Sequence, residues 1–158
     1  LMNGKPLIYF DNGASTQKPR AVIDAIVHHY EFDNANIHRG VYELSQRATD
    51  RYEAARSTVA KFLHVADPAE CIFTSGTTAA INLVASSWGK ANLKPGDEVL
   101  LTGLEHHSNI VPWQMVCNET QAKIRVVQPN ARGELDLADF RSALSPRTRM
   151  VALQHVSN

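Results

Sequence analysis

Hydroxyl side chains follow a glycine at the point where a strand-like pattern changes to a helix-like pattern. Residues 74–78 (Thr-Ser-Gly-Thr-Thr) lie between an apolar run at 71–73 and a helical pattern at 79–85. A helix N-terminus presents unpaired N–H groups and the positive end of the helix dipole, and the hydroxyls of Thr77 and Thr78 add hydrogen-bond donors. This combination suits a phosphate group. An ordinary N-cap beside a turn glycine has the same composition, so the pattern alone leaves both interpretations open.

Two segments place histidine in loops where the side chain can reach a ligand. His38 and Arg39 lie in the irregular stretch 34–40, and His106 lies in the segment 105–109 (Glu-His-His-Ser-Asn), which follows an apolar run. An imidazole titrates near neutrality and can move protons, and a guanidinium pairs with carboxylate or phosphate. Loops of this composition are also common as plain solvated surface.

The second of these segments raises the alternative of a metal site. Glu105, His106 and His107 carry metal-binding atoms, and His38 is a possible fourth ligand. Adjacent histidine side chains point apart, and the sequence holds no second, spaced pair of ligands. We therefore expect no metal ion at this place.

The order of elements places three polar loops at one edge of a sheet. After about residue 70, strand patterns alternate with helical patterns, which indicates a parallel, doubly wound α/β sheet. Ligands of such sheets bind beyond the carboxyl ends of the strands, where the turn at 74–78, the segment 105–109 and the pair Ser157-Asn158 fall. We expect these three to converge. The expected strands are 7–10, 71–73, 98–101, 123–128 and 148–156, and the expected helices begin near Pro19 and span 45–63, 79–85, 110–121 and 137–144.

Composition and charge exclude several classes of function. Of the 158 residues, 44% are hydrophobic and 20% are charged, which is ordinary for a globular domain. Lys plus Arg and Asp plus Glu both number 16, so the chain has no electrostatic footprint for nucleic acid or an anionic membrane. The apolar runs are too short to span a bilayer. Cys71 and Cys117 lack disulfide or zinc spacing, and we expect a cytoplasmic protein.

Five strings of residues carry a resemblance to a known family. The sequence resembles cysteine desulfurases of the type that serves iron–sulfur cluster assembly, which are fold-type I pyridoxal 5′-phosphate (PLP) enzymes of the class V aminotransferase group. It is more similar to the Suf branch than to the Isc/Nif branch. The strings are 9–15 (Tyr-Phe-Asp-Asn-Gly-Ala-Ser), 36–40 (Asn-Ile-His-Arg-Gly), 76–85 with Gly-Thr-Thr and Ile-Asn-Leu-Val-Ala, 105–114 (Glu-His-His-Ser-Asn-Ile-Val-Pro-Trp-Gln) and 155–158 (His-Val-Ser-Asn).

The resemblance implies a role for each matching residue. Thr77 and Thr78 would hold the PLP phosphate, and His106 would stack on the pyridine ring and assist proton transfers. Asn158 would hydrogen-bond the phenolic oxygen of the ring or its neighbourhood. His38 and Arg39 would line the substrate side of the pocket.

The resemblance also implies a reaction and its partners. The substrate would be L-cysteine, whose sulfur passes to an enzyme cysteine as a persulfide while alanine leaves. The whole enzyme would be a homodimer that delivers sulfur to an acceptor protein of the Suf system. Selenocysteine lyase, a kynureninase-like hydrolase and a plain aminotransferase share the threonine-rich turn and stay open as alternatives. A non-catalytic fragment that acts as an interaction domain is a further alternative.

The sequence lacks some residues that this chemistry needs. The family holds PLP through a lysine that follows a histidine, and no histidine here is followed by lysine. Cys71 and Cys117 do not match the family's nucleophile, and we interpret both as small core residues. We interpret the chain as the N-terminal portion of a longer enzyme that alone does not turn over cysteine. Residues 1–67 would form an N-terminal arm with helices, and 68–158 the first, incomplete part of the PLP-binding α/β domain.

Overall fold

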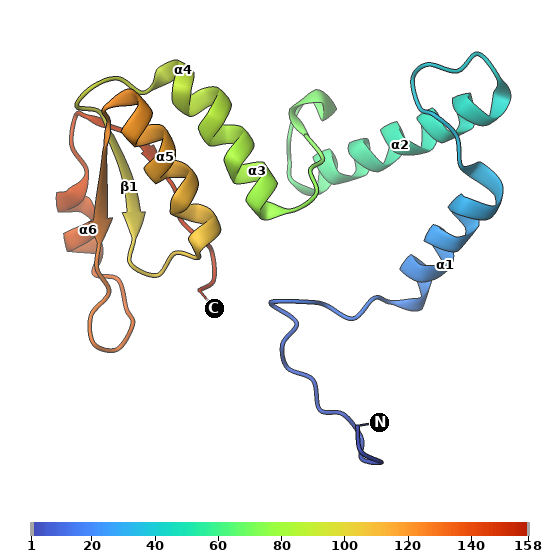
Figure 1. The fold of residues 1–158 in the computed structure, drawn as a ribbon, viewed down its shortest axis with the longest axis horizontal. Helices are drawn as coiled ribbons and strands as arrows, with labels where there is room; N and C mark the ends of the chain where they lie inside the picture. The colour runs from blue at the N-terminus through green and yellow to red at the C-terminus, as the bar shows by residue number, and fades with distance from the viewer. Residues whose placement is uncertain (1, 158) are drawn as a thin grey trace. The chain divides into compact units, whose positions relative to one another are not determined.

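The computed structural model describes residues 2–157, which form two compact units, Leu1–Phe73 and Thr74–Asn158 (Figure 1). Each unit has its own helices, and only the second has a sheet among the described residues. The domain boundary expected after residue 67 stays a prediction. No helix within residues 2–157 has both the length and the apolar character that crossing a membrane requires.

The first unit is built from two helices. Helix α1 (Arg20–His28) begins directly after Pro19 and continues as a π-helical turn, η1 (His29–Asp33). Helix α2 (Glu43–Phe62) buries Ser45, Ala48 and Ala60, and the 3₁₀ turn η2 (Pro68–Glu70) follows. The two predicted helices of this region are confirmed, with α2 starting two residues earlier than the sequence pattern suggested.

A buried carboxylate holds the end of the first helical segment to α2. Asp33 is only 2% exposed, and its carboxylate pairs with His28 Nδ1 at 3.1 Å, with Arg47 Nε at 2.9 Å and with Arg51. A buried charge is tolerated when it is paired in this way. Helix α1 itself buries no residue among those described.

Two predicted strands are wrong. Residues 7–10 form no strand, and Ile8 and Phe10 are 77% and 91% exposed. Residues 71–73 also form no strand, although Cys71 is buried. A strand needs a neighbour to receive its backbone hydrogen bonds, and neither segment pairs with another strand among the described residues. Instead, Arg56 donates from Nη1 to the Cys71 carbonyl at 3.1 Å.

The second unit contains a three-stranded parallel sheet in the order β2-β1-β3. Strand β1 (Glu98–Thr102) lies in the middle and is buried along its whole length, which explains its continuous apolar run. Strands β2 (Lys123–Val127) and β3 (Thr148–Val151) flank it. The predicted parallel α/β sheet is confirmed, but β3 stops at Val151 rather than at 156. The chain beyond β3 leaves the sheet to contact the loop after β1.

Helices cover this sheet. Helix α3 (Thr77–Val84) continues through the π-helical turn η3 (Ala85–Gly89) into α4 (Lys90–Asn92). The 3₁₀ turn η4 (His107–Asn109) leads into α5 (Val111–Thr120), and α6 (Leu137–Ala143) precedes β3. Helix α5 packs across β1 in Figure 1. The buried core of this unit is formed by Ala85, Leu93, Val99, Leu101, Trp113, Val116 and Cys117.

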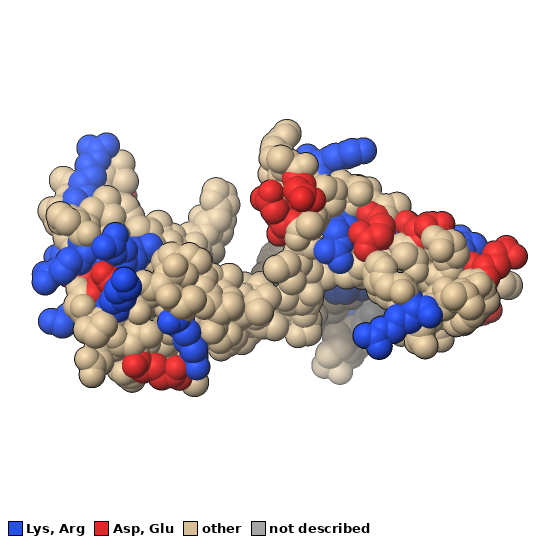
Figure 2. Space-filling view, turned by 90° about the horizontal axis from the view of Figure 1, so that it is seen from above, with Lys and Arg blue, Asp and Glu red and all other residues tan. Residues whose placement is uncertain are grey.

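Arginines surround two carboxylates where the strands begin, and basic side chains gather on part of this unit in Figure 2. Glu98 accepts from Ser145 Oγ at 2.7 Å, which lowers the pKa of Glu98. The Lys94 amide donates to Asp97 at 2.9 Å and lowers the pKa of Asp97 in the same way. These contacts tie the turn before β1 and the start of β3 to the sheet, at the end of β1 away from His106.

Candidate functional site

The first helical turn of α3 keeps its hydroxyl groups free. The residue at the N-cap is Gly76, with no capping side chain, so the alternative of an ordinary hydroxyl cap is not observed. Gly76 has φ 152° and ψ 177°, a conformation that is essentially restricted to glycine. Within the described part of the chain, the hydroxyls of Thr77 and Thr78 make no hydrogen bond. The N–H groups of the first turn have no carbonyl partner inside the helix, so donors of both kinds face outward.

The loop after β1 holds His106 in a defined orientation. His106 is the N-cap residue of η4, and the Ser108 amide donates to its Nδ1 at 3.2 Å, with Ser108 Oγ 2.9 Å from the same atom. An Nδ1 that accepts from an amide carries a lone pair, so Nε2 carries the proton of the neutral ring. The His107 ring stands at 82° to that of His106, so the two adjacent imidazoles do not converge on one point.

Glu105 binds the surrounding elements together. Its carboxylate accepts from Thr102 Oγ1 at 2.6 Å, from Asn109 Nδ2 at 2.7 Å and from the backbone N–H of Gln154 at 2.9 Å. Asn109 Oδ1 in turn accepts from Trp113 Nε1 at 3.0 Å. The metal alternative assigned Glu105 a ligand role, whereas its oxygens are occupied by these donors. Among the residues that the structure describes, no group of three potential metal ligands is present.

Thr77 and His106 line one pocket of about 430 Å³, within the size range of small-ligand sites. An adjoining depression of about 320 Å³ is lined by Thr78 and again by His106. The predicted meeting of the turn at 74–78 with the segment 105–109 is therefore observed. The third expected point is Ser157-Asn158, where Ser157 Oγ donates to the Leu104 carbonyl at 3.1 Å. Asn158 lies outside the described residues.

The lining of the pocket fits an aromatic anion. Ile81, Val84 and Trp113 supply apolar surface. No carboxylate belongs to the described lining of either hollow. Gln154 also lines the larger pocket, and its buried Nε2 has no hydrogen-bond partner among the described residues. A buried side-chain amide without a hydrogen-bond partner is costly unless a ligand or water binds it. Sequence reasoning missed Gln154, and its only signal was its position just beyond the last strand of the sheet.

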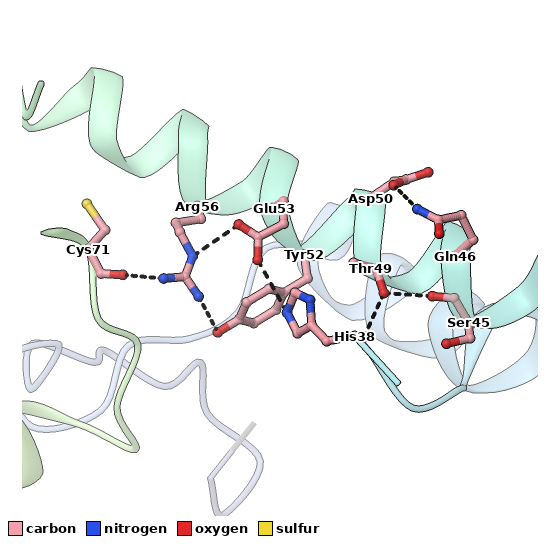
Figure 3. Close-up of polar contacts among 9 residues, drawn as sticks. All are labelled: His38, Ser45, Gln46, Thr49, Asp50, Tyr52, Glu53, Arg56 and Cys71. Atoms are coloured by element: carbon pink, nitrogen blue, oxygen red, sulfur yellow. Dashed lines mark hydrogen bonds and ion pairs between the residues drawn. The ribbon is translucent and has the colours of Figure 1, made fainter. Parts of the chain in front are cut away.

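His38 and Arg39 belong to the first unit, where a network on α2 holds the loop 36–40 (Figure 3). The His38 amide donates to Thr49 Oγ1 at 2.9 Å, and Nε2 lies 3.3 Å from Glu53 Oε1. His38 has φ 64°, which is uncommon for a residue other than glycine. Arg39 is exposed. The assignment of both residues to the substrate side stays a prediction.

The same network continues along α2 to the segment that precedes the Gly-Thr-Thr turn. In Figure 3, the Arg56 guanidinium lies between Glu53, the Tyr52 hydroxyl and the Cys71 carbonyl. The Tyr52 and Phe73 rings meet edge to face, with centroids 5.6 Å apart. Residues 71–73 are therefore held by side-chain contacts to α2 instead of by strand pairing.

Comparison with known proteins agrees with this geometry. The family model described as "Aminotransferase class-V" matches residues 8–158. A probable cysteine desulfurase from Synechocystis is 53% identical over 99% of this chain, and the match covers 37% of that relative. The chain thus spans little more than a third of the length of that relative.

Solved structures show the same fold. The apo structure of a cysteine desulfurase from Thermococcus onnurineus NA1 matches 96% of this chain with a TM-score of 0.89 and 39% identity, and the match covers 37% of that structure. A C-DES mutant with glycine covalently linked to its PLP cofactor matches 92% of this chain and 37% of its own, with a TM-score of 0.69 and 25% identity. Because the family model covers nearly all of the sequence and the fold agrees, the chain belongs to the class-V aminotransferase family.

Proposed function

We propose that this chain carries the phosphate-binding turn and the ring-facing histidine of a PLP-dependent cysteine desulfurase. The observation that carries the proposal is the placement of Thr77, Thr78 and His106 around two adjoining hollows that share His106. The names of the relatives, cysteine desulfurases at about half identity, support the choice of reaction.

The residues present suit the separate parts of PLP. The free hydroxyls and amides at the start of α3 suit its phosphate. His106 presents a flat ring that can lie against the pyridine and accept or return a proton at its ring nitrogens. Asn158 would bind the phenolic oxygen, and His38 and Arg39 would contact the substrate. Bound PLP supplies an electron sink that weakens the C–S bond of L-cysteine.

The sulfur-accepting thiol is not one of the two cysteines of this chain. Cys71 and Cys117 are buried, at 7% and 4% exposure. Burial also raises the pKa of the Cys117 thiol, whereas the nucleophile has to be a thiolate. No lysine here follows a histidine. We therefore expect the 158-residue chain to bind the cofactor without converting cysteine to alanine, those steps requiring residues that it does not contain.

Further parts of the proposal come from the family strings of the sequence. The Glu-His-His string at 105–107 supports a Suf-type enzyme, and with it iron–sulfur cluster assembly, a Suf-type sulfur acceptor, a homodimer and a cytoplasmic location. Selenocysteine lyase and other class-V activities are the competing outcomes. They are distinguished by comparing L-cysteine with L-selenocysteine as substrates of an enzyme that joins this chain to the lysine and the cysteine of the family.

The test uses pyridoxine 5′-phosphate, which has the ring and phosphate of PLP but no aldehyde to react with surface lysines. We expect saturable binding, followed by fluorescence, with competition by inorganic phosphate. Replacing Thr77 and Thr78 together by valine should weaken binding by roughly tenfold or more, the effect of losing two hydrogen bonds. Thr58→Val, on α2, is the matched control and should leave the affinity unchanged.

Two results would contradict the proposal. One is the absence of saturable binding to the unchanged chain. The other is equal affinity of the double valine variant, which would place the phosphate elsewhere. Alanine and sulfide are measured in parallel with added PLP and L-cysteine, and alanine formation at enzyme-like rates would contradict the expectation that this chain alone is inactive.

A further inference from the structure

Glu105 is a buried carboxylate whose hydrogen-bond partners are all neutral. It is 9% exposed, and in the described part of the chain no cation lies within ion-pair distance of it. Its three donors come from the end of β1, from η4 and from the segment after β3. A carboxylate removed from water is costly unless hydrogen bonds replace its hydration, so these three contacts are needed to keep it in place.

The directions of these hydrogen bonds are set by further partners. Because Trp113 donates to Asn109 Oδ1, the Asn109 amide nitrogen faces Glu105. Because the Leu104 amide donates to Thr102 Oγ1 at 3.3 Å, the Thr102 hydroxyl proton points to Glu105. Every neighbour is thus a donor, which matches an ionised carboxylate, a group that only accepts. A side-chain amide in place of this carboxylate would have its N–H₂ group facing one of these donors, where no hydrogen bond can form.

This arrangement fixes the turn that carries His106 at both of its ends. Glu105 is the residue before His106, and Asn109 closes the turn with its amide donating to the His106 carbonyl at 2.8 Å. Within this turn the Ser108 amide meets His106 Nδ1. The Nε2-protonated form of the ring therefore depends on a backbone turn that Glu105 holds to β1 and to Gln154.

We propose that Glu105 is a positioning residue, which keeps His106 in its Nε2-protonated form and at a fixed orientation at the rim of the cofactor pocket. This inference rests on the proposed PLP-binding function. Glu105 acts through Thr102, Asn109 and the Gln154 amide and does not itself line either hollow. It also couples the segment after β3, whose Gln154 lines the pocket, to the same turn.

The test compares Glu105→Gln with Glu98→Gln. Glu98 is the matched control, since it is also a buried, hydrogen-bonded glutamate, and it lies at the other end of β1. The ring nitrogens of His106 are followed by long-range ¹H–¹⁵N correlation spectra, assigned with His106→Gln. We expect the unchanged chain to show one tautomer and Glu105→Gln to show a mixture. Glu105→Gln should also bind pyridoxine 5′-phosphate about three- to tenfold more weakly, as for one lost hydrogen bond.

Glu98→Gln should lower the thermal midpoint without changing the His106 tautomer or the affinity. The proposal is overturned if Glu105→Gln folds and keeps the single Nε2-protonated tautomer. If Glu105→Gln does not fold, Thr102→Val replaces it in the comparison, because it removes one of the three donors to Glu105. We then expect a partial shift of His106 from the single tautomer to a mixture. An unchanged His106 tautomer in Thr102→Val would overturn the inference. If the unchanged chain does not bind pyridoxine 5′-phosphate, the proposed function fails, whereas the tautomer comparison still decides the positioning role.

Discussion

Gly40 is the position where adding a single methyl group should have a large and local effect. It closes the loop 36–40, which contains the two residues assigned to the substrate side. A Cβ built on Gly40 would lie 2.4 Å from both Cβ and Oγ of Ser45, and 2.8 Å from the Tyr42 ring. Contacts this short are not tolerated, so Gly40→Ala must displace Ser45 or the loop itself.

The cost follows from what Ser45 does in this position. Its Oγ accepts from the Gly40 amide at 3.1 Å and donates to the Asn36 carbonyl at 2.5 Å, and the residue is 1% exposed. Overpacking costs about 1–3 kcal/mol, and each of the two hydrogen bonds is worth about 1 kcal/mol. If both hydrogen bonds are lost, we expect Gly40→Ala to lower the local free energy of unfolding by about 3–5 kcal/mol.

Amide hydrogen exchange along α2 and the loop measures this change, because it reports local opening in a chain with two units. Gly13→Ala is the control, since a Cβ at Gly13 meets no atom within 4 Å. Ser45→Gly removes two of the three clashing atoms and leaves the Tyr42 ring, so combining it with Gly40→Ala should recover part of the loss, seen as a favourable coupling energy in a double-mutant cycle. Equal protection in Gly40→Ala and Gly13→Ala would refute the reasoning.

Three further changes test other parts of the structure. The pKa of Glu98 lies below its ordinary value of 4.5, first because the Ser145 hydroxyl donates to the carboxylate. The ionised Glu98 therefore stabilises the folded chain above pH 4.5, and this stabilisation is lost as the pH falls below that value. Urea unfolding should therefore show stability falling with acid, less steeply in Glu98→Gln, and equal slopes would count against this assignment. Gly76→Ala should cost about 1–3 kcal/mol through backbone strain and weaken pyridoxine 5′-phosphate binding; a crystal structure with an unmoved α3 N-terminus would argue otherwise. Cys117, buried and with a raised pKa, should resist iodoacetamide until the chain is unfolded, as mass spectrometry checks; labelling of the native chain at the rate of a free thiol would show that the site is open.

Much of the second unit was predictable from local patterns. The apolar run of β1 and the helical pattern of α5 each depend on residues only a few positions apart, so they identify elements without knowledge of the fold. The parallel arrangement followed from the alternation of strands and helices. The meeting of Thr77 with His106 was also predicted, but from an expected strand at 71–73 that does not form; the start of α3 lies beside η4 without that strand.

The failures share one cause. Residues 7–10 and 71–73 have the apolar character of strands, but a strand exists only where another chain segment offers hydrogen bonds beside it, and in the described structure none does. The end of β3 was misplaced because the chain after Val151 turns away to donate to Glu105. A short stretch of sequence does not show whether a neighbouring strand is present, or whether a residue far along the chain will form a hydrogen bond with it.

By itself, the sequence indicated the family and a helix that begins after Gly76 with two hydroxyl residues in its first turn, and it predicted that this turn lies near His106. The first two follow from local chemistry, whereas the proximity was predicted from a strand at 71–73 that the described structure does not contain. Only the tertiary structure decided that Gly76 caps α3 without using a hydroxyl and that Glu105 collects donors from three separate segments. Hydrogen bonds between residues such as Glu105 and Gln154 join positions 49 residues apart, and such pairings exist only once the sheet has brought the segments together.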